Sequence, residues 1–199
     1  MKKQIFLSFR PEFFRPILYG IKKYEYRKRF CKEAATAFLY LSAPIQEVIG
    51  IMELGVPIMT KDIITKYPLD SDIYERTKHC IDVGEQYAIP IESLQLYKNP
   101  ITITQIKELE SSFSVPRCYL DITNFRILYD FLQKQERYDI EFYNDHTTIY
   151  EDNFGCTCKE MEMTTEFEIK DSIYISNPKY QNIRCGYLNK KFMAREGIY

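Results

Sequence analysis

Residues 5–29 constrain the fold more than any other stretch, because they predict two strands and a helix in quick succession. Ile5 to Arg10 read as a short apolar strand. Pro11 then opens a segment with apolar residues at helical spacing, namely Phe13, Phe14, Ile17 and Leu18. Gly20 stands where a left-handed helix cap favours glycine, and residues 21–29 read as a second, basic strand.

Alternation along this second strand predicts two different faces. Successive side chains of a strand point to opposite sides, so one face should carry Lys22, Tyr24, Tyr26 and Lys28. The other should carry Lys23, Glu25, Arg27 and Arg29. A face with tyrosines suits packing, whereas a face with a glutamate and arginines suits a polar ligand.

The same residues resemble the signature G-x-K-x-x-E-x-R of the ASCH family, a branch of the PUA-like superfamily of small β-barrels. The resemblance is carried by Ser8-Phe9-Arg10-Pro11, Ile17-Leu18, Gly20, Lys22, Glu25 and Arg27. It extends more weakly to about residue 122, through the turn Ser42-Ala43-Pro44 and the glycine-centred strand around Gly50. Lys23 departs from the pattern, because family members commonly have threonine there.

The resemblance implies an α+β fold, a PUA-like small β-barrel with flanking helices. Apolar runs predict further strands at 37–41, 48–54 and 87–97, the last at an edge or with a bulge because of Pro90. Two helices are expected within 59–83, divided at 67–70, with Asp70 or Ser71 as N-cap of the second. Thr102 or Thr104 should cap a helix through Leu109, and another should span 124–134.

Residues beyond 135 lie outside the resemblance and read as a separate extension. Short alternating stretches at 140–143, 148–150, 163–169 and 172–175 predict several extra antiparallel strands. We therefore divide the chain into an ASCH/PUA-like domain, 1–135, and a β-rich C-terminal extension, 136–199, packed on the barrel.

Charge is distributed unevenly along a chain whose formal net charge is −1. Residues 1–33 contain ten Lys and Arg against three acids, whereas residues 136–178 contain eleven acids against three basic residues. The cationic head predicts an anionic partner such as RNA or a nucleotide, because phosphate neutralisation supplies most non-specific affinity. The acidic, tyrosine-rich extension, residues 136–199, could also bind a protein partner.

Composition argues against a membrane protein, a secreted protein and a metal-binding protein. No stretch is apolar enough for a membrane span and no signal segment is recognisable, so we expect a cytoplasmic protein without a membrane partner. The six cysteines should then be reduced thiols. Neither the Cys156-x-Cys158 pair nor the two histidines have zinc-site spacing, so we expect no metal and no cofactor.

The resemblance implies that the motif residues line a cleft beside the first helix. We expect binding of RNA or a modified nucleotide, with Arg27 on a phosphate or base edge, Lys22 as a point charge and Glu25 as a hydrogen-bond acceptor. An aromatic ring among Phe9, Tyr19 and Tyr24 would stack on the base. The predicted binding residues are Ser8, Arg10, Lys22, Glu25, Arg27 and Arg29.

Two alternatives stay open, and with them the question whether the protein is an enzyme. Some ASCH-type proteins are ribonucleases or N4-acetylcytidine amidohydrolases, and here Lys22 and Glu25 would serve such a reaction. The threonine nucleophile of the amidohydrolase motif is replaced by Glu25, so Ser8 would have to supply the hydroxyl. The second alternative is a protein-interaction module that pairs through edge strands of the extension.

Overall fold

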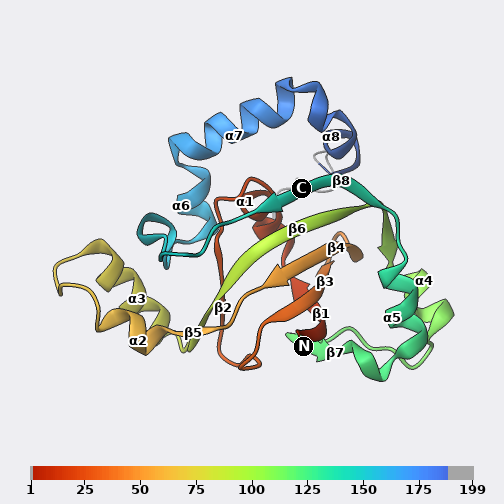
Figure 1. Cartoon of the computed structure of the whole chain (residues 1–199), viewed down its shortest axis with the longest axis horizontal. Helices are drawn as coiled ribbons and strands as arrows, with labels where there is room; N and C mark the ends of the chain where they lie inside the picture. The colour runs from red at the N-terminus through yellow and green to blue at the C-terminus, as the bar shows by residue number, and fades with distance from the viewer. Residues whose placement is uncertain (1, 188–199) are drawn as a thin grey trace.

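Eight strands form one curled sheet in the computed structural model, which describes residues 2–187 (Figure 1). The strands are β1 (Lys3–Phe9), β2 (Tyr24–Arg27), β3 (Ala35–Leu41), β4 (Glu47–Leu54), β5 (Ile58–Met59), β6 (Tyr87–Thr102), β7 (Tyr119–Asp121) and β8 (Arg137–Tyr143). Their order is β2-β6-β4-β3-β1-β7, with β5 and β8 also paired to β6. β1 and β3 run parallel, and the other pairs are antiparallel.

The central strands are buried on both faces, which explains their continuous apolar sequences. Along β3, Ala37 and Leu39 belong to the core enclosed by the curl, whereas Phe38 belongs to a second core on the outer face. β1 alternates in the same way, with Leu7 inside and Phe6 outside. Both cores therefore require the register in which Phe6 lies beside Phe38.

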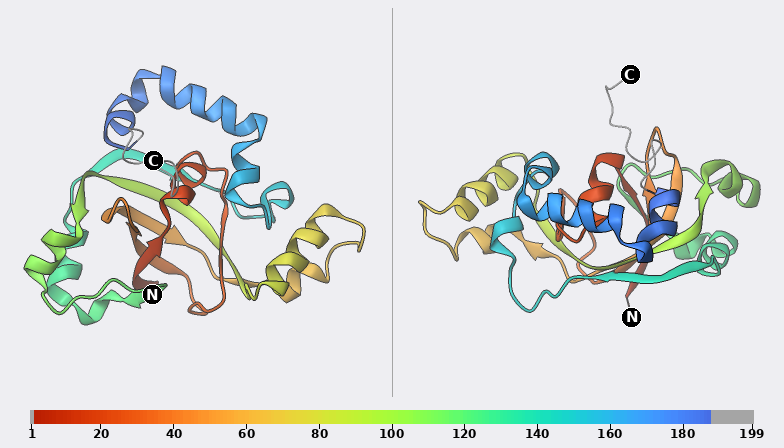
Figure 2. Two further views of the ribbon diagram at one scale, coloured as in Figure 1. Left: turned by 180° about the vertical axis from the view of Figure 1, so that it is seen from behind. Right: turned by 90° about the horizontal axis from the view of Figure 1, so that it is seen from above.

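The helices lie in three groups around the sheet. α2 and α3 project at one end, α4 and α5 cover the other, and α6 to α8 run along one side near α1 (Figures 1 and 2). Their bounds are α1 (Phe14–Leu18), α2 (Thr60–Ile64), α3 (Asp72–Asp82), α4 (Ile103–Leu109), α5 (Arg126–Gln133), α6 (Cys158–Glu162), α7 (Thr165–Ser176) and α8 (Gln181–Tyr187).

Local signals in the sequence locate the ends of the first helices correctly. Gly20 has φ of 71°, a left-handed conformation that favours glycine, and the chain turns there from α1 towards β2. The Ser71 side chain accepts from Tyr74 N at the start of α3, and Thr102 forms a capping box with Gln105 at the start of α4.

Strand β6 is central and not at an edge, and of the two expectations for Pro90 it has the irregular ladder of a bulge. It has 16 residues and pairs with β2, β4, β5 and β8, so it is the most extensively paired strand of the described sheet. The ladder to β4 is irregular where Leu54 pairs with Ile91, next to Pro90. The missing N–H of Pro90 is thus accommodated beside a bulge within a central strand.

The extension contains one of the expected strands, since β8 covers the stretch predicted at 140–143 and adds to the barrel sheet. The strands expected at 163–169 and 172–175 are wrong, because residues 165–176 form helix α7, and residues 148–150 form neither strand nor helix. Thr164 caps α7, and its buried residues Phe167 and Tyr174 are seven apart, two helical turns.

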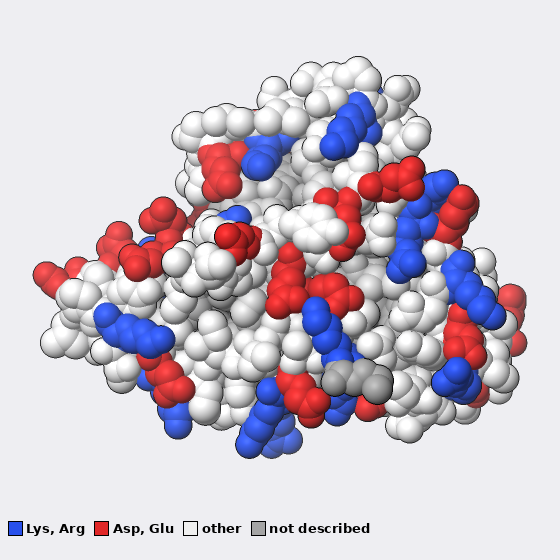
Figure 3. Space-filling model, viewed as in Figure 1, with Lys and Arg blue, Asp and Glu red and all other residues white. Residues whose placement is uncertain are grey.

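The α+β barrel predicted from the sequence is confirmed, and the extension packs on it. Buried side chains of the extension enter the same core as the barrel strands, namely Met161, Phe167, Tyr174, Ile183 and Tyr187. The boundary at residue 135 stays a prediction. On the face shown in Figure 3, basic and acidic side chains are intermixed. None of the helices within residues 2–187 is long and apolar enough to cross a membrane.

Candidate functional site

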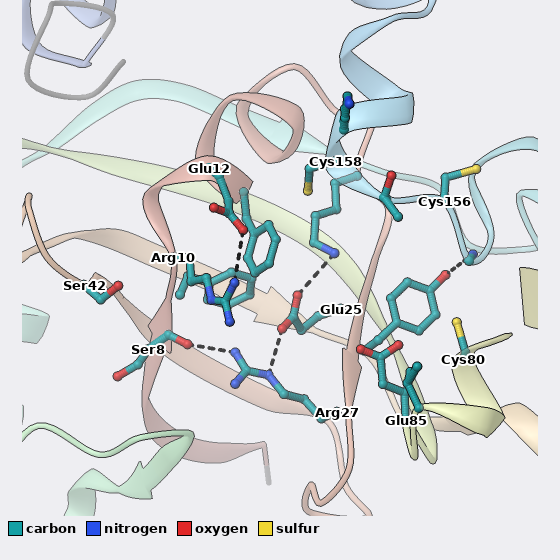
Figure 4. A pocket seen from close by; sticks show the side chains of 18 of the residues that line it. Ser8, Arg10, Glu12, Glu25, Arg27, Ser42, Cys80, Glu85, Cys156 and Cys158 are labelled. Atoms are coloured by element: carbon teal, nitrogen blue, oxygen red, sulfur yellow. Dashed lines mark hydrogen bonds and ion pairs between the residues drawn. The ribbon is translucent and has the colours of Figure 1, made fainter. Parts of the chain in front are cut away.

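A cavity of about 940 Å³ opens where the end of β1, strand β2, helix α3 and the start of α6 meet (Figure 4). Ser8, Arg10, Lys22, Glu25 and Arg27 all line it, so five of the six residues predicted to bind a ligand are brought together. The sixth, Arg29, is exposed beyond the end of β2 and does not line the cavity.

The turn at Gly20 and the short strand β2 position the three motif side chains. Glu25 and Arg27 are alternate residues of β2 and share one side of it, as predicted. Lys22 was expected on the side of the tyrosines, but β2 begins only at Tyr24. Because Lys22 precedes the strand, its side chain does not follow the strand's alternation, and its ammonium lies against Glu25.

Glu25 is the centre of a buried ion-pair group. Its Oε1 lies 2.8 Å from Arg27 Nε and its Oε2 lies 3.3 Å from Lys22 Nζ. Lys22 and Glu25 are 5% and 4% exposed. The Arg27 Nε hydrogen is not aligned on the carboxylate, so this contact is an ion pair without a hydrogen bond.

Backbone carbonyls hold the two cations in place. Arg27 Nη2 donates to Ser8 O at 2.8 Å, and Lys22 Nζ donates to Tyr24 O at 2.9 Å. The Lys22 ammonium also lies 5.2 Å from the centre of the Phe13 ring. These contacts fix two positive charges around one negative charge at largely buried side chains, which favours an anionic guest.

The entrance adds cations from distant parts of the chain. Arg10 follows β1, Arg117 precedes β7 and Lys159 lies in α6, and all three line the cavity and are exposed. The Arg10 side chain is 69% exposed, and its contact with Glu12 is long, at 3.5 Å. Such exposed cations are suited to attracting a phosphate backbone.

The serine proposed as a substitute nucleophile is engaged elsewhere. Ser8 Oγ donates to Pro116 O at 2.7 Å, whereas the polar partners of Lys22 in the described chain are Tyr24 O and Glu25. A serine nucleophile needs a base within hydrogen-bond reach of its hydroxyl. In this conformation Ser8 and Lys22 do not form that pair.

Sequence analysis missed the walls contributed by α3 and the extension. His79 and Cys80 come from α3, and Cys156, Thr157 and Cys158 come from the segment leading into α6. No sequence motif joins these residues to Glu25, because their contact depends on tertiary packing of segments far apart in the chain.

The thiols around the cavity are neutral. Burial, reinforced by the neighbouring Glu85 carboxylate, raises the pKa of Cys80 to about 12. Burial also raises the pKa of Cys158 to about 11, although the Lys22 ammonium acts in the opposite direction. Since the thiolate is the reactive form, neither thiol is suited to nucleophilic chemistry at neutral pH. Within residues 2–187, no cluster of three His, Cys, Asp or Glu residues could hold a metal ion.

Alkylation should report these pKa values directly. At about pH 7.5, we expect iodoacetamide to modify Cys158 roughly 100-fold more slowly than a free thiol, because a pKa of about 11 in place of 9.0 lowers the thiolate fraction by that factor. Peptide mass spectrometry would follow each cysteine, with exposed Cys185 as the internal comparison. Modification of Cys158 as fast in the folded protein as in guanidinium would contradict the prediction.

A solved structure of an ASCH protein shares this fold. A tyrosine-to-phenylalanine variant of the Zymomonas mobilis ASCH protein is 20% identical, with 68% of this chain and 100% of that chain covered at a TM-score of 0.50. The unsubstituted protein is 23% identical, with 64% and 94% covered at a TM-score of 0.46. No protein-family model and no curated protein matches the sequence. At this identity the likeness establishes the fold.

Proposed function

We propose, from the premise that this chain has the ASCH fold, that its cavity binds a nucleotide or the nucleotides of single-stranded RNA. The observation that carries the proposal is the buried ion-pair group, in which Lys22 and Arg27 share the single carboxylate of Glu25. A phosphate group is the complementary guest, because it accepts the hydrogen bonds that arginine and lysine donate.

The charge balance of the site supports an anion as ligand. Both oxygens of Glu25 already face a cation, so the buried group retains one excess positive charge. An unbalanced charge away from water is costly, and a bound anion lowers that cost. The lining of the whole cavity contains five Lys and Arg residues and four Glu residues, so it also carries one excess positive charge.

Aromatic rings next to the cations suit the base of a nucleotide. The Arg27 guanidinium lies 5.2 Å from the centre of the Phe9 ring, which is buried and supports the guanidinium from behind, and the partly buried ring of Phe13 lies beside Lys22. Bases of single-stranded RNA stack on such rings and on guanidinium planes. The volume of about 940 Å³ also falls within the roughly 300–1,000 Å³ typical of small-molecule sites.

Replacing Arg27 with alanine tests the proposal. We expect the affinity for a single-stranded RNA of mixed sequence to fall roughly 10- to 100-fold, because hydrogen bonds to a charged group contribute about 1.5–3 kcal/mol. Fluorescence anisotropy at increasing salt would measure the affinity, which should weaken steadily as salt rises.

Two further variants keep this test decisive. Arg126→Ala removes an arginine on α5 that does not line the cavity and should leave binding unchanged. Arg27→Lys keeps the charge but not the planar donors, and is expected to retain the fold and part of the affinity. Unchanged affinity in Arg27→Ala, with its thermal transition intact, would refute RNA binding at this site.

We do not extend the proposal to acyl hydrolysis. That reaction would need the Ser8 hydroxyl next to the Lys22 amine, whereas Ser8 Oγ donates to Pro116 O. Binding alone requires no such pair and uses the cations where they lie.

A further inference from the structure

One wall of the cavity is a segment of the extension that has no counterpart in the sequence resemblance. We call residues 150–158, which follow β8 and end at the first residue of α6, the strap. Gly155, Cys156, Thr157 and Cys158 of the strap line the cavity. The strap runs from near β5 and α3 up to the start of α6 (Figure 1).

The strap is bonded to the strand that carries the ion pairs. Tyr24 OH accepts a hydrogen bond from Tyr150 N at 3.0 Å, and Tyr26 OH accepts one from Gly155 N at 2.6 Å. Between them, Phe154 is 0% exposed, with ring centres 5.0 Å from Tyr24 and 5.6 Å from Tyr26. β2 therefore supports the strap with its tyrosines and the ion-pair group with Glu25.

The strap is bonded equally firmly to α3 on its other side. Arg76 donates from Nε to Phe154 O at 2.7 Å and from Nη2 to Glu151 O at 2.8 Å. Gly155 has φ of 73°, and a Cβ there would lie 2.8 Å from Arg76 Cβ. Backbone and helix are thus in direct contact at Gly155, so the strap is closed against the middle of α3.

The two ends of the cavity consequently differ. Ser8 and Arg10 lie at one end in Figure 4, and Cys80, Glu85 and Cys156 lie at the other, against α3 and the strap. A nucleic-acid strand that continued past the ion-pair group under the strap would have to separate the strap from β2 or from α3. Either path breaks the hydrogen bonds described above and exposes Phe154.

We infer that the strap makes the cavity a blind site, which takes a free mononucleotide or the terminal nucleotide of a strand and excludes nucleotides within a strand. This inference rests on the proposed function and specifies its ligand. Terminal recognition follows because the exposed cations Arg10 and Arg117 can contact a strand outside the cavity while its last nucleotide reaches Arg27.

A comparison of linear and circular RNA tests the inference with the full-length protein. Isothermal titration calorimetry would use an unlabelled linear RNA of about 20 nucleotides, longer than a single binding site, and a circle of the same sequence. We expect the linear RNA to bind roughly tenfold or more tightly than the circle. A mixture of the four ribonucleoside monophosphates should compete with the linear RNA, because both occupy the same cavity. Comparing the affinity of the monophosphates with that of the linear RNA distinguishes the free nucleotide from the strand end as the preferred ligand.

Loosening the strap should reduce the preference for linear over circular RNA. Arg76→Ala removes both bonds from α3, and its preference for linear over circular RNA should fall towards one, while Arg126→Ala should keep the preference. If the native protein binds circular and linear RNA with equal affinity, and Arg27→Ala loses both, the blind site is overturned and the proposed function still stands. Absence of binding by RNA and by the monophosphates would overturn both. Because the native protein alone decides the comparison, a folding defect in Arg76→Ala does not obscure it.

Discussion

Replacing Glu25 with alanine should lower the free energy of unfolding by about 3–5 kcal/mol, as expected when one partner of a buried ion pair is removed. Glu25 is the only carboxylate that the described structure pairs with Lys22 or Arg27. Without it, the buried Lys22 ammonium and the largely buried Arg27 guanidinium have no carboxylate partner among the described residues. Urea unfolding followed by circular dichroism would measure the loss.

Companion variants separate the buried charge from other causes. Glu136→Ala also removes a carboxylate from an ion pair, with Lys98, but this pair is largely exposed and the change should stay within about 1 kcal/mol. Adding Lys22→Met to Glu25→Ala should restore part of the stability, because it removes one unpaired charge. If Glu25→Ala and Glu136→Ala unfold at the same urea concentration, the ion-pair group does not have the energetic weight assigned to it.

Truncation after Gln135 should abolish cooperative unfolding. The extension supplies five buried side chains to the barrel core, and each contributes about 1.5–3 kcal/mol. Their sum is comparable with the about 5–15 kcal/mol that constitutes the whole net stability of a domain. Tyr187 illustrates the connection, because its hydroxyl donates to Tyr97 O at 2.6 Å, deep in β6.

Thermal melting of residues 1–135 would measure this dependence. We expect a broad, non-cooperative change with exposed apolar surface detectable by dye binding. The full-length protein is the reference and should melt in one transition. A sharp transition of the truncated chain near that of the full-length protein would mean that the barrel folds without the extension.

Much of the barrel could be predicted because its signals are local. The apolar run of β3, the glycine after α1 and the Thr102 capping box each specify a structure from a few adjacent residues. The convergence of Lys22, Glu25 and Arg27 was expected only from the resemblance, because strand alternation alone puts Lys22 on the opposite face from Glu25 and Arg27. Lys22 joins them because it precedes the strand.

Long-range packing determines what the sequence did not predict. In α7, Ile169, Ile173 and Ile175 are exposed and gave a strand-like alternation, although the helix packs through Phe167 and Tyr174. Alternation of apolar and polar residues predicts a strand only if the polar residues are the ones exposed to solvent. In α7 several apolar side chains are exposed instead. The strap wall likewise depends on Arg76 and Tyr26, which lie far from Gly155 in sequence.

Because β6 pairs with several strands, an insertion within it would affect more than one part of the sheet. Its first residues pair with β2, and those from Ile91 onward pair with β4. Inserting one residue between Pro90 and Ile91 would shift one ladder against the other and turn the following side chains to the opposite face. The carboxylate of Glu25 and the carbonyl of Ser8 would then lose their alignment, although neither residue had changed. Tolerance to insertions should therefore be lowest at a position that does not itself line the cavity.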